Sequence, residues 1–107
     1  MNERIKAIIK RPDEPVGHET YIRNDLKAFQ STVDGYIETL PCGEAVIIVN
    51  EEGKLRDLPA NFAYTNVTRD LIMGTVVVVG VDGDEFTDVP FGIGTWANYL
   101  WKWGNAV

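Results

Sequence analysis

The stretch Thr75-Val76-Val77-Val78-Val79 decides the fold class, because four consecutive valines favour a strand over a helix. Valine branches at Cβ, which restricts χ1 and suits a pleated surface that is buried on both faces. A second β-branched run, Ala45-Val46-Ile47-Ile48-Val49, lies earlier in the chain. The two runs predict a pair of buried strands in one sheet.

A helix is predicted between the N-terminal strand and these runs, over residues 25–33. Asn24 is the expected N-cap. Leu26, Phe29 and Val33 then recur at the spacing of one helical face. Gly35 is expected to end the helix in the left-handed conformation that a side chain would oppose. This segment supplies the one central helix of the predicted fold.

The C-terminal segment predicts a short aromatic helix over residues 95–104, with Thr95 as its expected N-cap. One face of this helix should close the core, and it carries Trp96, Leu100 and Trp103. Tyr99 and Trp101 fall partly outside that face, so we predict that they form an interface. A homodimer through this helix is the expected arrangement, since two-fold dimers are the commonest assemblies.

The remaining elements are shorter and complete one domain over residues 1–107. The patterns predict a strand over 4–10, a loop over 11–19, a strand over 36–40, a hairpin turn at 50–53 with a returning strand at 54–57, and a short strand over 85–88. This order favours an α+β domain with a mainly antiparallel sheet of about five strands. One core is expected to contain Leu26, Phe29, Ile47, Val49, Val77 and Val79.

Composition and charge exclude several classes of protein. The 107 residues include 10 basic and 16 acidic side chains, for a net charge of −6, which argues against direct nucleic-acid binding. Cys42 is the single cysteine, so no internal disulfide can form, and a reducing compartment is favoured. The longest apolar stretch is too short for a bilayer, which needs about 20 residues. We therefore expect a protein of the host-cell cytoplasm without membrane contact.

Five stretches stand in an order that resembles a known family. They are Val33-Asp34-Gly35-Tyr36-Ile37-Glu38, Val49-Asn50-Glu51-Glu52-Gly53-Lys54-Leu55, Leu58-Pro59-Ala60-Asn61, Ile72-Met73-Gly74-Thr75-Val76-Val77-Val78-Val79-Gly80 and Gly83-Asp84-Glu85-Phe86-Thr87-Asp88. Together, over roughly residues 4–90, they resemble the domain-of-unknown-function family numbered 3846, found in bacteriophages and in mobile elements of gut-type Gram-positive bacteria. The resemblance implies a small stand-alone phage or mobile-element protein and assigns no catalytic residues. The Trp-rich tail after Pro90 departs from the pattern expected of the family.

Polar side chains on two segments predict a site for a small polar or nucleotide-type ligand. Glu51 and Glu52 could accept hydrogen bonds from ribose hydroxyls or an exocyclic amine, while Lys54 or Arg56 meets a phosphate. The irregular segment that follows adds Asn61, Tyr64, Asn66 and Arg69. Irregular segments next to a rigid sheet often carry small-ligand sites. A plain hairpin turn is the alternative explanation for residues 50–54.

Groups for catalysis or metal binding are sparse in the sequence. His18 is the single histidine and lies in a loop rich in proline and glycine. Cys42 could pair with it as nucleophile and base only if the fold brings the two together. No zinc, calcium or phosphate-loop spacing is present in the sequence. We therefore expect no cofactor and no metal, and the sequence favours a protein without enzymatic activity.

Three classes of function stay open. The favoured class is a non-enzymatic binding protein from a phage or mobile element, which sequesters a nucleotide-type signal in counter-defence or binds a host factor. The second class is a protein inhibitor with an acidic or aromatic surface, such as an antirestriction DNA mimic. Four acids and no base between Gly80 and Ala97 motivate it: Asp82, Asp84, Glu85 and Asp88. The third class is a small enzyme with an unrecognised site.

Overall fold

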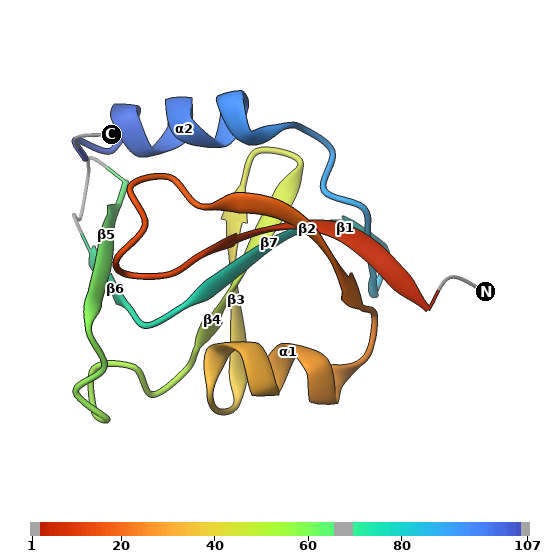
Figure 1. Cartoon of the computed structure of the whole chain (residues 1–107), viewed down its shortest axis with the longest axis horizontal. Coiled ribbons are helices and arrows are strands. Elements are labelled where there is room, and N and C mark those ends of the chain that lie inside the picture. Colours follow the sequence, from red (N-terminus) through yellow and green to blue (C-terminus); the bar gives the residue numbers. More distant parts are fainter. Residues whose placement is uncertain (1–2, 66–69, 106–107) are drawn as a thin grey trace.

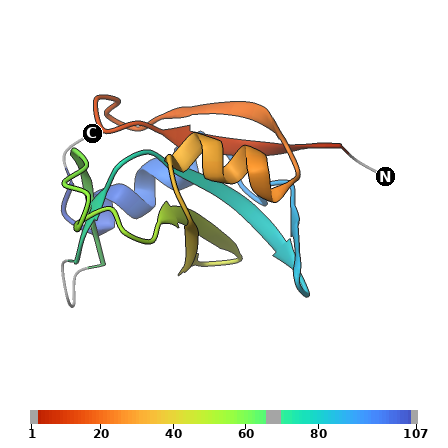
Figure 2. The ribbon, with the colours of Figure 1, turned by 90° about the horizontal axis from the view of Figure 1, so that it is seen from below.

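A computed structural model describes residues 3–65 and 70–105 of the chain and shows an antiparallel sheet with one helix on each face (Figures 1 and 2). The main sheet has six strands in the order β2-β1-β7-β4-β3, and β8 also pairs with β7. These strands are β1 (Arg4–Lys10), β2 (His18–Arg23), β3 (Ile37–Cys42), β4 (Ala45–Asn50), β7 (Val76–Asp82) and β8 (Glu85–Thr87). A second sheet pairs β5 (Ala60–Tyr64) with β6 (Asp70–Met73). The two helices are α1 (Leu26–Val33) and α2 (Ile93–Lys102), and the predicted α+β class is confirmed.

The two β-branched runs are neighbours in the main sheet. β4 pairs with β7 in antiparallel register, with Ile47 opposite Val78 and Ile48 opposite Val77. β4 pairs with one edge of β7, and β1 and β8 share the other edge. β1 pairs with the first half of β7, and β8 pairs with the second half. The prediction of a pair of buried strands in one sheet is therefore confirmed.

The core consists of two clusters on opposite faces of the sheet, so the prediction of one core is wrong. Successive side chains of a strand point to opposite faces. Val78 therefore packs with Ile47 and Val49 beneath α2, whereas Val77 and Val79 pack beneath α1. The four valines at positions 76–79 are fully buried, as the two-sided environment requires.

The helix α1 covers its face of the sheet with fewer residues than predicted. Phe29 and Val33 are buried against the strands, but Leu26 is 57% exposed and does not belong to the core. The N-cap is Asp25, whose carboxylate accepts a hydrogen bond from the Ala28 N–H at 2.8 Å, and not the predicted Asn24. At the other end Asp34, with φ 66°, takes the left-handed position that was expected for Gly35.

The helix α2 closes the opposite face with the predicted aromatic stripe. Trp96 and Leu100 are fully buried and Trp103 is nearly so. The Trp96 ring meets Phe62 edge-on at 5.6 Å between centroids, and its indole N–H donates to the Val16 carbonyl at 2.8 Å. The helix begins at Ile93 with Gly92 as its N-cap, so the predicted cap Thr95 is wrong, and the Glu19 carboxylate accepts a hydrogen bond from the Ile93 N–H at 2.8 Å.

Two loop predictions are corrected by the backbone. Residues 11–19 are not all loop, since β2 begins at His18 and pairs with β1 from Ile9 back to Arg4. Residues 54–57 do not return as a strand, because residues 51–57 form consecutive turns. Gly53 is required there by a close approach and not by a positive φ: a Cβ at this position would lie 3.0 Å from the Met73 carbonyl oxygen. Within the described ranges, no helix has the length and apolarity needed to cross a bilayer.

Candidate functional site

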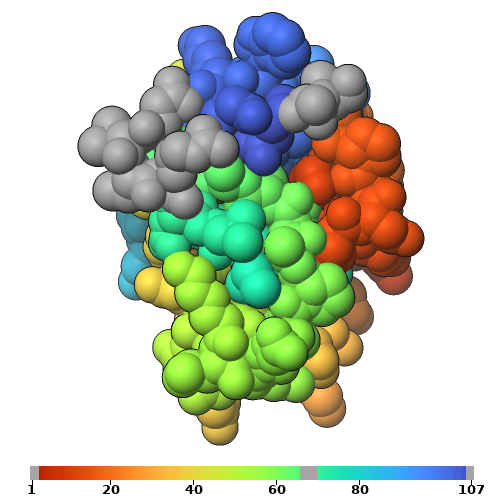
Figure 3. Space-filling view, turned by 90° about the vertical axis from the view of Figure 1, so that its left-hand side faces the viewer, coloured from red at the N-terminus to blue at the C-terminus, as the bar shows by residue number. Residues whose placement is uncertain are grey.

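Residues 51–57 form a run of turns that follows β4 and carries four of the predicted ligand-binding side chains: Glu51, Glu52, Lys54 and Arg56. The run is held by its own backbone, with the Arg56 N–H donating to the Glu52 carbonyl at 2.9 Å and the Leu58 N–H donating to the Gly53 carbonyl at 3.1 Å. Figure 3 shows it as the yellow-green lobe at the bottom of one face of the molecule. The predicted group therefore projects from one compact surface segment.

The buried amide of Asn50 fixes this segment to the end of α1. Asn50 is 6% exposed. Its Nδ2 donates to the carbonyls of Val33 and Asp34, each at 3.0 Å, and its Oδ1 accepts from the Glu52 N–H at 2.7 Å. One side chain thus joins the last turn of the helix to the start of the run, and it brings residues distant in sequence to one surface.

A pocket of about 320 Å³ lies where these two segments meet, and we call it the Tyr36 pocket. Its lining comprises Gln30, Gly35, Tyr36, Glu52 and Arg56. The Tyr36 ring is 67% exposed. The Arg56 guanidinium donates to the Asp34 carbonyl, and its Nη2 lies 3.2 Å from the Asp34 carboxylate. An aromatic ring, a held guanidinium and the carboxylate of Glu52, which forms no ion pair with any described residue, are therefore presented together.

A smaller pocket, of about 200 Å³, lies on the other side of the same run, toward β3 and β6. Lys54 and Leu55 line it together with Glu51 and Glu52. Lys54 is engaged in an ion pair with Asp70, so it is less available to a phosphate than the sequence suggested. Leu55 is 87% exposed. This pocket offers an apolar rim and no uncompensated cation among its described lining residues.

Asn61 and Tyr64, which were also predicted to bind the ligand, do not join this surface. The Asn61 amide bonds to Lys10 and Gly74, and the Tyr64 hydroxyl donates to the Pro41 carbonyl at 2.6 Å. The Tyr64 ring also packs on Trp103 at 5.1 Å between centroids. Both side chains therefore hold the second sheet against the rest of the molecule. Asn66 and Arg69 lie outside the described residues.

The two predicted interface residues differ in environment. Tyr99 is half-buried, with its ring between those of Phe91 and Trp103 at 5.8 and 5.7 Å between centroids. Trp101 is 67% exposed, and its indole stacks on none of the rings in the described ranges. Tyr99 therefore packs largely within its own chain, whereas Trp101 presents its indole to the surroundings.

His18 and Cys42, the pair considered for catalysis, lie in β2 and β3, which are at opposite ends of the strand order of the main sheet. His18 Nδ1 lies 2.8 Å from the Glu14 carboxylate. Cys42 is 2% exposed, and burial raises the pKa of its thiol to about 12. A thiol with that pKa stays protonated near neutral pH and is a poor nucleophile. Across residues 3–65 and 70–105, no group of three side chains is arranged to hold a metal ion.

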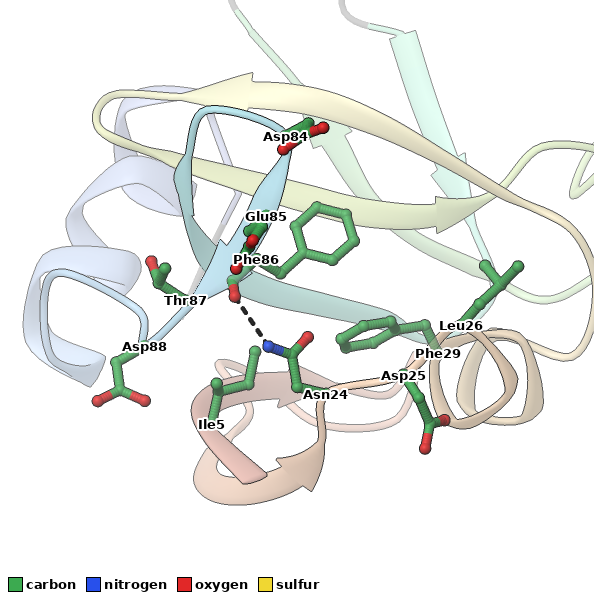
Figure 4. A pocket seen from close by; sticks show the side chains of 10 residues that line it. All are labelled: Ile5, Asn24, Asp25, Leu26, Phe29, Asp84, Glu85, Phe86, Thr87 and Asp88. Carbon is green, nitrogen blue, oxygen red and sulfur yellow. Dashed lines mark hydrogen bonds between the residues drawn. The ribbon is translucent and has the colours of Figure 1, made fainter. Parts of the chain in front are cut away.

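A further pocket, of about 710 Å³, was not predicted from the sequence, and we call it the acidic groove. It lies between the first turn of α1, the start of β1 and the hairpin of β7 and β8 (Figure 4). Its lining comprises Ile5, Asn24, Asp25, Leu26, Phe29, Asp84, Glu85, Phe86, Thr87 and Asp88. Four carboxylates thus surround an apolar floor. The run of acids without a base was the one sequence signal for this groove.

Fold and surface together define a small α+β domain with pockets at both ends of α1. The model of the family described as "Domain of unknown function (DUF3846)" matches residues 5–98, and the chain belongs to that family. The match extends beyond Pro90 and includes Trp96, so the expected departure of the tail from the family is wrong up to residue 98. None of the curated proteins and none of the solved structures matches the chain.

Proposed function

We propose that this chain is a non-enzymatic binding protein whose Tyr36 pocket holds a small nucleotide-type ligand. The observation that carries the proposal is the meeting of Glu52 and Arg56, both predicted for such a ligand, with the exposed ring of Tyr36 in one pocket. The volume of about 320 Å³ lies at the small end of ligand pockets, which run from roughly 300 to 1,000 Å³. A single nucleotide suits it better than a larger ligand.

Each lining group matches one part of a nucleotide. An exposed aromatic ring can stack on a base, which contributes about 1–3 kcal/mol per base. Arginine carries five N–H donors in a planar fork, and two of those of Arg56 are engaged with Asp34, which leaves the others for phosphate oxygens. The Glu52 carboxylate can accept from ribose hydroxyls. Base, phosphate and sugar therefore each have a partner in the pocket.

In the cell, the proposed role of the protein is to sequester a nucleotide signal in the cytoplasm of the host. A phage or mobile element that encodes a stoichiometric binder can lower the free concentration of a nucleotide signal used in defence. The protonated, buried thiol of Cys42 and the pairing of His18 with Glu14 support binding without turnover.

A second candidate function is contact with a protein, and the exposed indole of Trp101 favours it. Tryptophan is enriched in the hot spots of protein interfaces. A second copy of the chain is the simplest partner, since a two-fold dimer through α2 would place the same indole on both subunits. A host factor is the alternative partner of this surface.

Calorimetric titration of the full chain with a panel of mononucleotides, cyclic nucleotides and dinucleotides tests the proposal. We expect at least one nucleotide to bind at one site per chain, and Tyr36→Ala and Arg56→Gln each to weaken it at least tenfold. Tyr21→Ala is the matched control, because Tyr21 is 63% exposed on β2 and lies outside the pocket lining. The proposal is wrong if no nucleotide binds at millimolar concentration, or if Tyr21→Ala weakens binding as much as Tyr36→Ala.

A further inference from the structure

The acidic groove exists because two strands share one edge of β7. β1 pairs with β7 only through Ile8–Lys10 and then diverges, while β8 pairs with the last residues of β7, Gly80–Asp82. Hydrogen bonds span the resulting gap: the Asn24 amide donates to the Phe86 carbonyl at 2.9 Å, and the Lys6 N–H donates to the Asp88 carboxylate at 2.8 Å. Figure 4 shows the first of these bonds crossing the groove. These bonds fix the two sides of the groove relative to each other.

The floor and one rim of the groove are apolar. Ile5 and Phe29 are almost completely covered at the floor, and the Phe29 ring meets Phe86 edge-on at 5.2 Å between centroids. Leu26 lines the groove beside them and is 57% exposed, although the other apolar positions of α1, Phe29 and Val33, are buried. An apolar side chain that is placed next to a hydrophobic floor and left uncovered by its own chain offers a contact for another molecule.

The charge of the groove is negative and incompletely neutralised. Asp25 lies 3.1 Å from the Arg23 guanidinium, and Asp88 accepts a backbone N–H. Asp84 and Glu85, at the turn between β7 and β8, have no cationic partner within 4.0 Å among the described residues. Among the residues that the structure describes, no lysine, arginine or histidine lines the groove. This surface therefore repels phosphates and attracts cations, in contrast to the Tyr36 pocket.

We infer that the acidic groove binds a basic, amphipathic peptide segment of a partner protein. Lysine or arginine side chains of the segment pair with Asp84 and Glu85, and an apolar residue between them packs on Leu26 and Phe86. A peptide fits better than a small cation because the groove presents exposed apolar surface at Leu26 beside the carboxylates of Asp84 and Glu85. A segment that carries both basic and apolar side chains can contact both kinds of surface, whereas a small cation contacts only the carboxylates. Charge complementarity of this kind selects partners and speeds association.

Peptide display tests the inference with the full chain. A library of random peptides is selected on the immobilised protein, and the most enriched peptide is synthesised with a fluorescent label for anisotropy titrations. We expect enriched peptides to combine lysine or arginine with an apolar residue, and their affinity to fall as salt rises, because exposed charges are screened. A selection without enrichment, or with enrichment of neutral or acidic peptides, overturns the inference.

Matched variants locate the peptide on the molecule. The double variant Asp84→Asn/Glu85→Gln and the single variant Leu26→Ser should each weaken binding at least tenfold. Glu38→Gln/Glu44→Gln removes the same charge from exposed positions outside the groove and should change the affinity less than twofold. Equal weakening by the two double variants would show attraction to overall charge, and full binding by Leu26→Ser would show that the apolar rim is not used; either result refutes the inference. Because none of these variants changes a residue that lines the Tyr36 pocket, failure here is separable from failure of the nucleotide proposal.

Discussion

Replacing Asn61 by alanine should destabilise the fold strongly and leave ligand binding to the folded protein unchanged. The Asn61 Nδ2 donates to the carbonyls of Lys10 and Gly74, at 2.9 and 2.8 Å, and its Oδ1 accepts from the Lys10 ammonium at 2.5 Å. Lys10 is 3% exposed, with its ammonium 5.9 Å from the centre of the Phe62 ring. Asn61, in strand β5 of the second sheet, thus bonds to both the backbone and the buried ammonium of Lys10, the last residue of β1.

The magnitude follows from the bonds that the substitution removes. Two neutral hydrogen bonds contribute about 1 kcal/mol each, and one bond from a charged donor contributes about 1.5–3 kcal/mol. Water can replace part of this loss, because a pocket of about 220 Å³ adjoins Lys10 and Asn61. We therefore expect a loss of about 3 kcal/mol, which is a large share of the roughly 5–15 kcal/mol that stabilises a typical domain.

Urea denaturation followed by tryptophan fluorescence measures this loss, since Trp96 and Trp103 are buried in the folded state. With a slope of roughly 1–3 kcal/mol per molar urea, the midpoint should fall by about 1–3 M. Asn98→Ala is the control, because Asn98 is exposed on α2 and its loss should change stability by less than about 0.5 kcal/mol. A loss below about 1 kcal/mol for Asn61→Ala would refute the structural role. Weaker nucleotide binding by the folded variant would restore the ligand role that the sequence suggested.

Three further predictions concern the helix α2 and two buried side chains. Trp101→Glu should convert a dimer into a folded monomer in size-exclusion chromatography with light scattering, and a monomeric parent protein would exclude self-association through this helix. Burial lowers the pKa of Lys10 below that of the unfolded chain, so the unfolded state binds more protons between the two values. The stability of the parent protein relative to Lys10→Met should therefore rise with pH through that interval, as measured by urea denaturation at mildly and strongly alkaline pH; a fall would contradict the assignment. Cys42, with its pKa raised to about 12 and 2% exposure, should resist iodoacetamide in the native protein and react in denaturant, and fast native labelling would contradict its burial.

The α+β fold could be predicted because its strongest signals are local. Four valines in a row specify a buried strand wherever they are placed, and the spacing of Trp96, Leu100 and Trp103 specifies one helical face. The strand β2 escaped prediction because its first residues follow a segment rich in proline and glycine, and its pairing partner β1 decides its conformation. The division of the core into two clusters was not predicted, because it depends on which face of the sheet each of α1 and α2 covers.

The candidate site could be predicted only where its residues are close in sequence. Glu52 and Arg56 meet in one pocket because the turns of 51–57 bring them together locally. Tyr36 was not predicted as a site residue, because its place beside Arg56 depends on the buried amide of Asn50, which bonds to the end of α1. The acidic groove depends on the divergence of β1 from β7, and the sequence carries no signal for that divergence.

Two-dimensional ¹H–¹⁵N NMR of the full chain, titrated with the nucleotide panel at up to millimolar concentration, tests the nucleotide proposal most directly. It detects weak binding and locates it in the same spectrum. The account predicts that at least one nucleotide shifts the amide signals of the lining of the Tyr36 pocket first, at Gln30, Gly35, Tyr36, Glu52 and Arg56. Unchanged spectra across the whole panel, or shifts that gather elsewhere on the molecule, would contradict it.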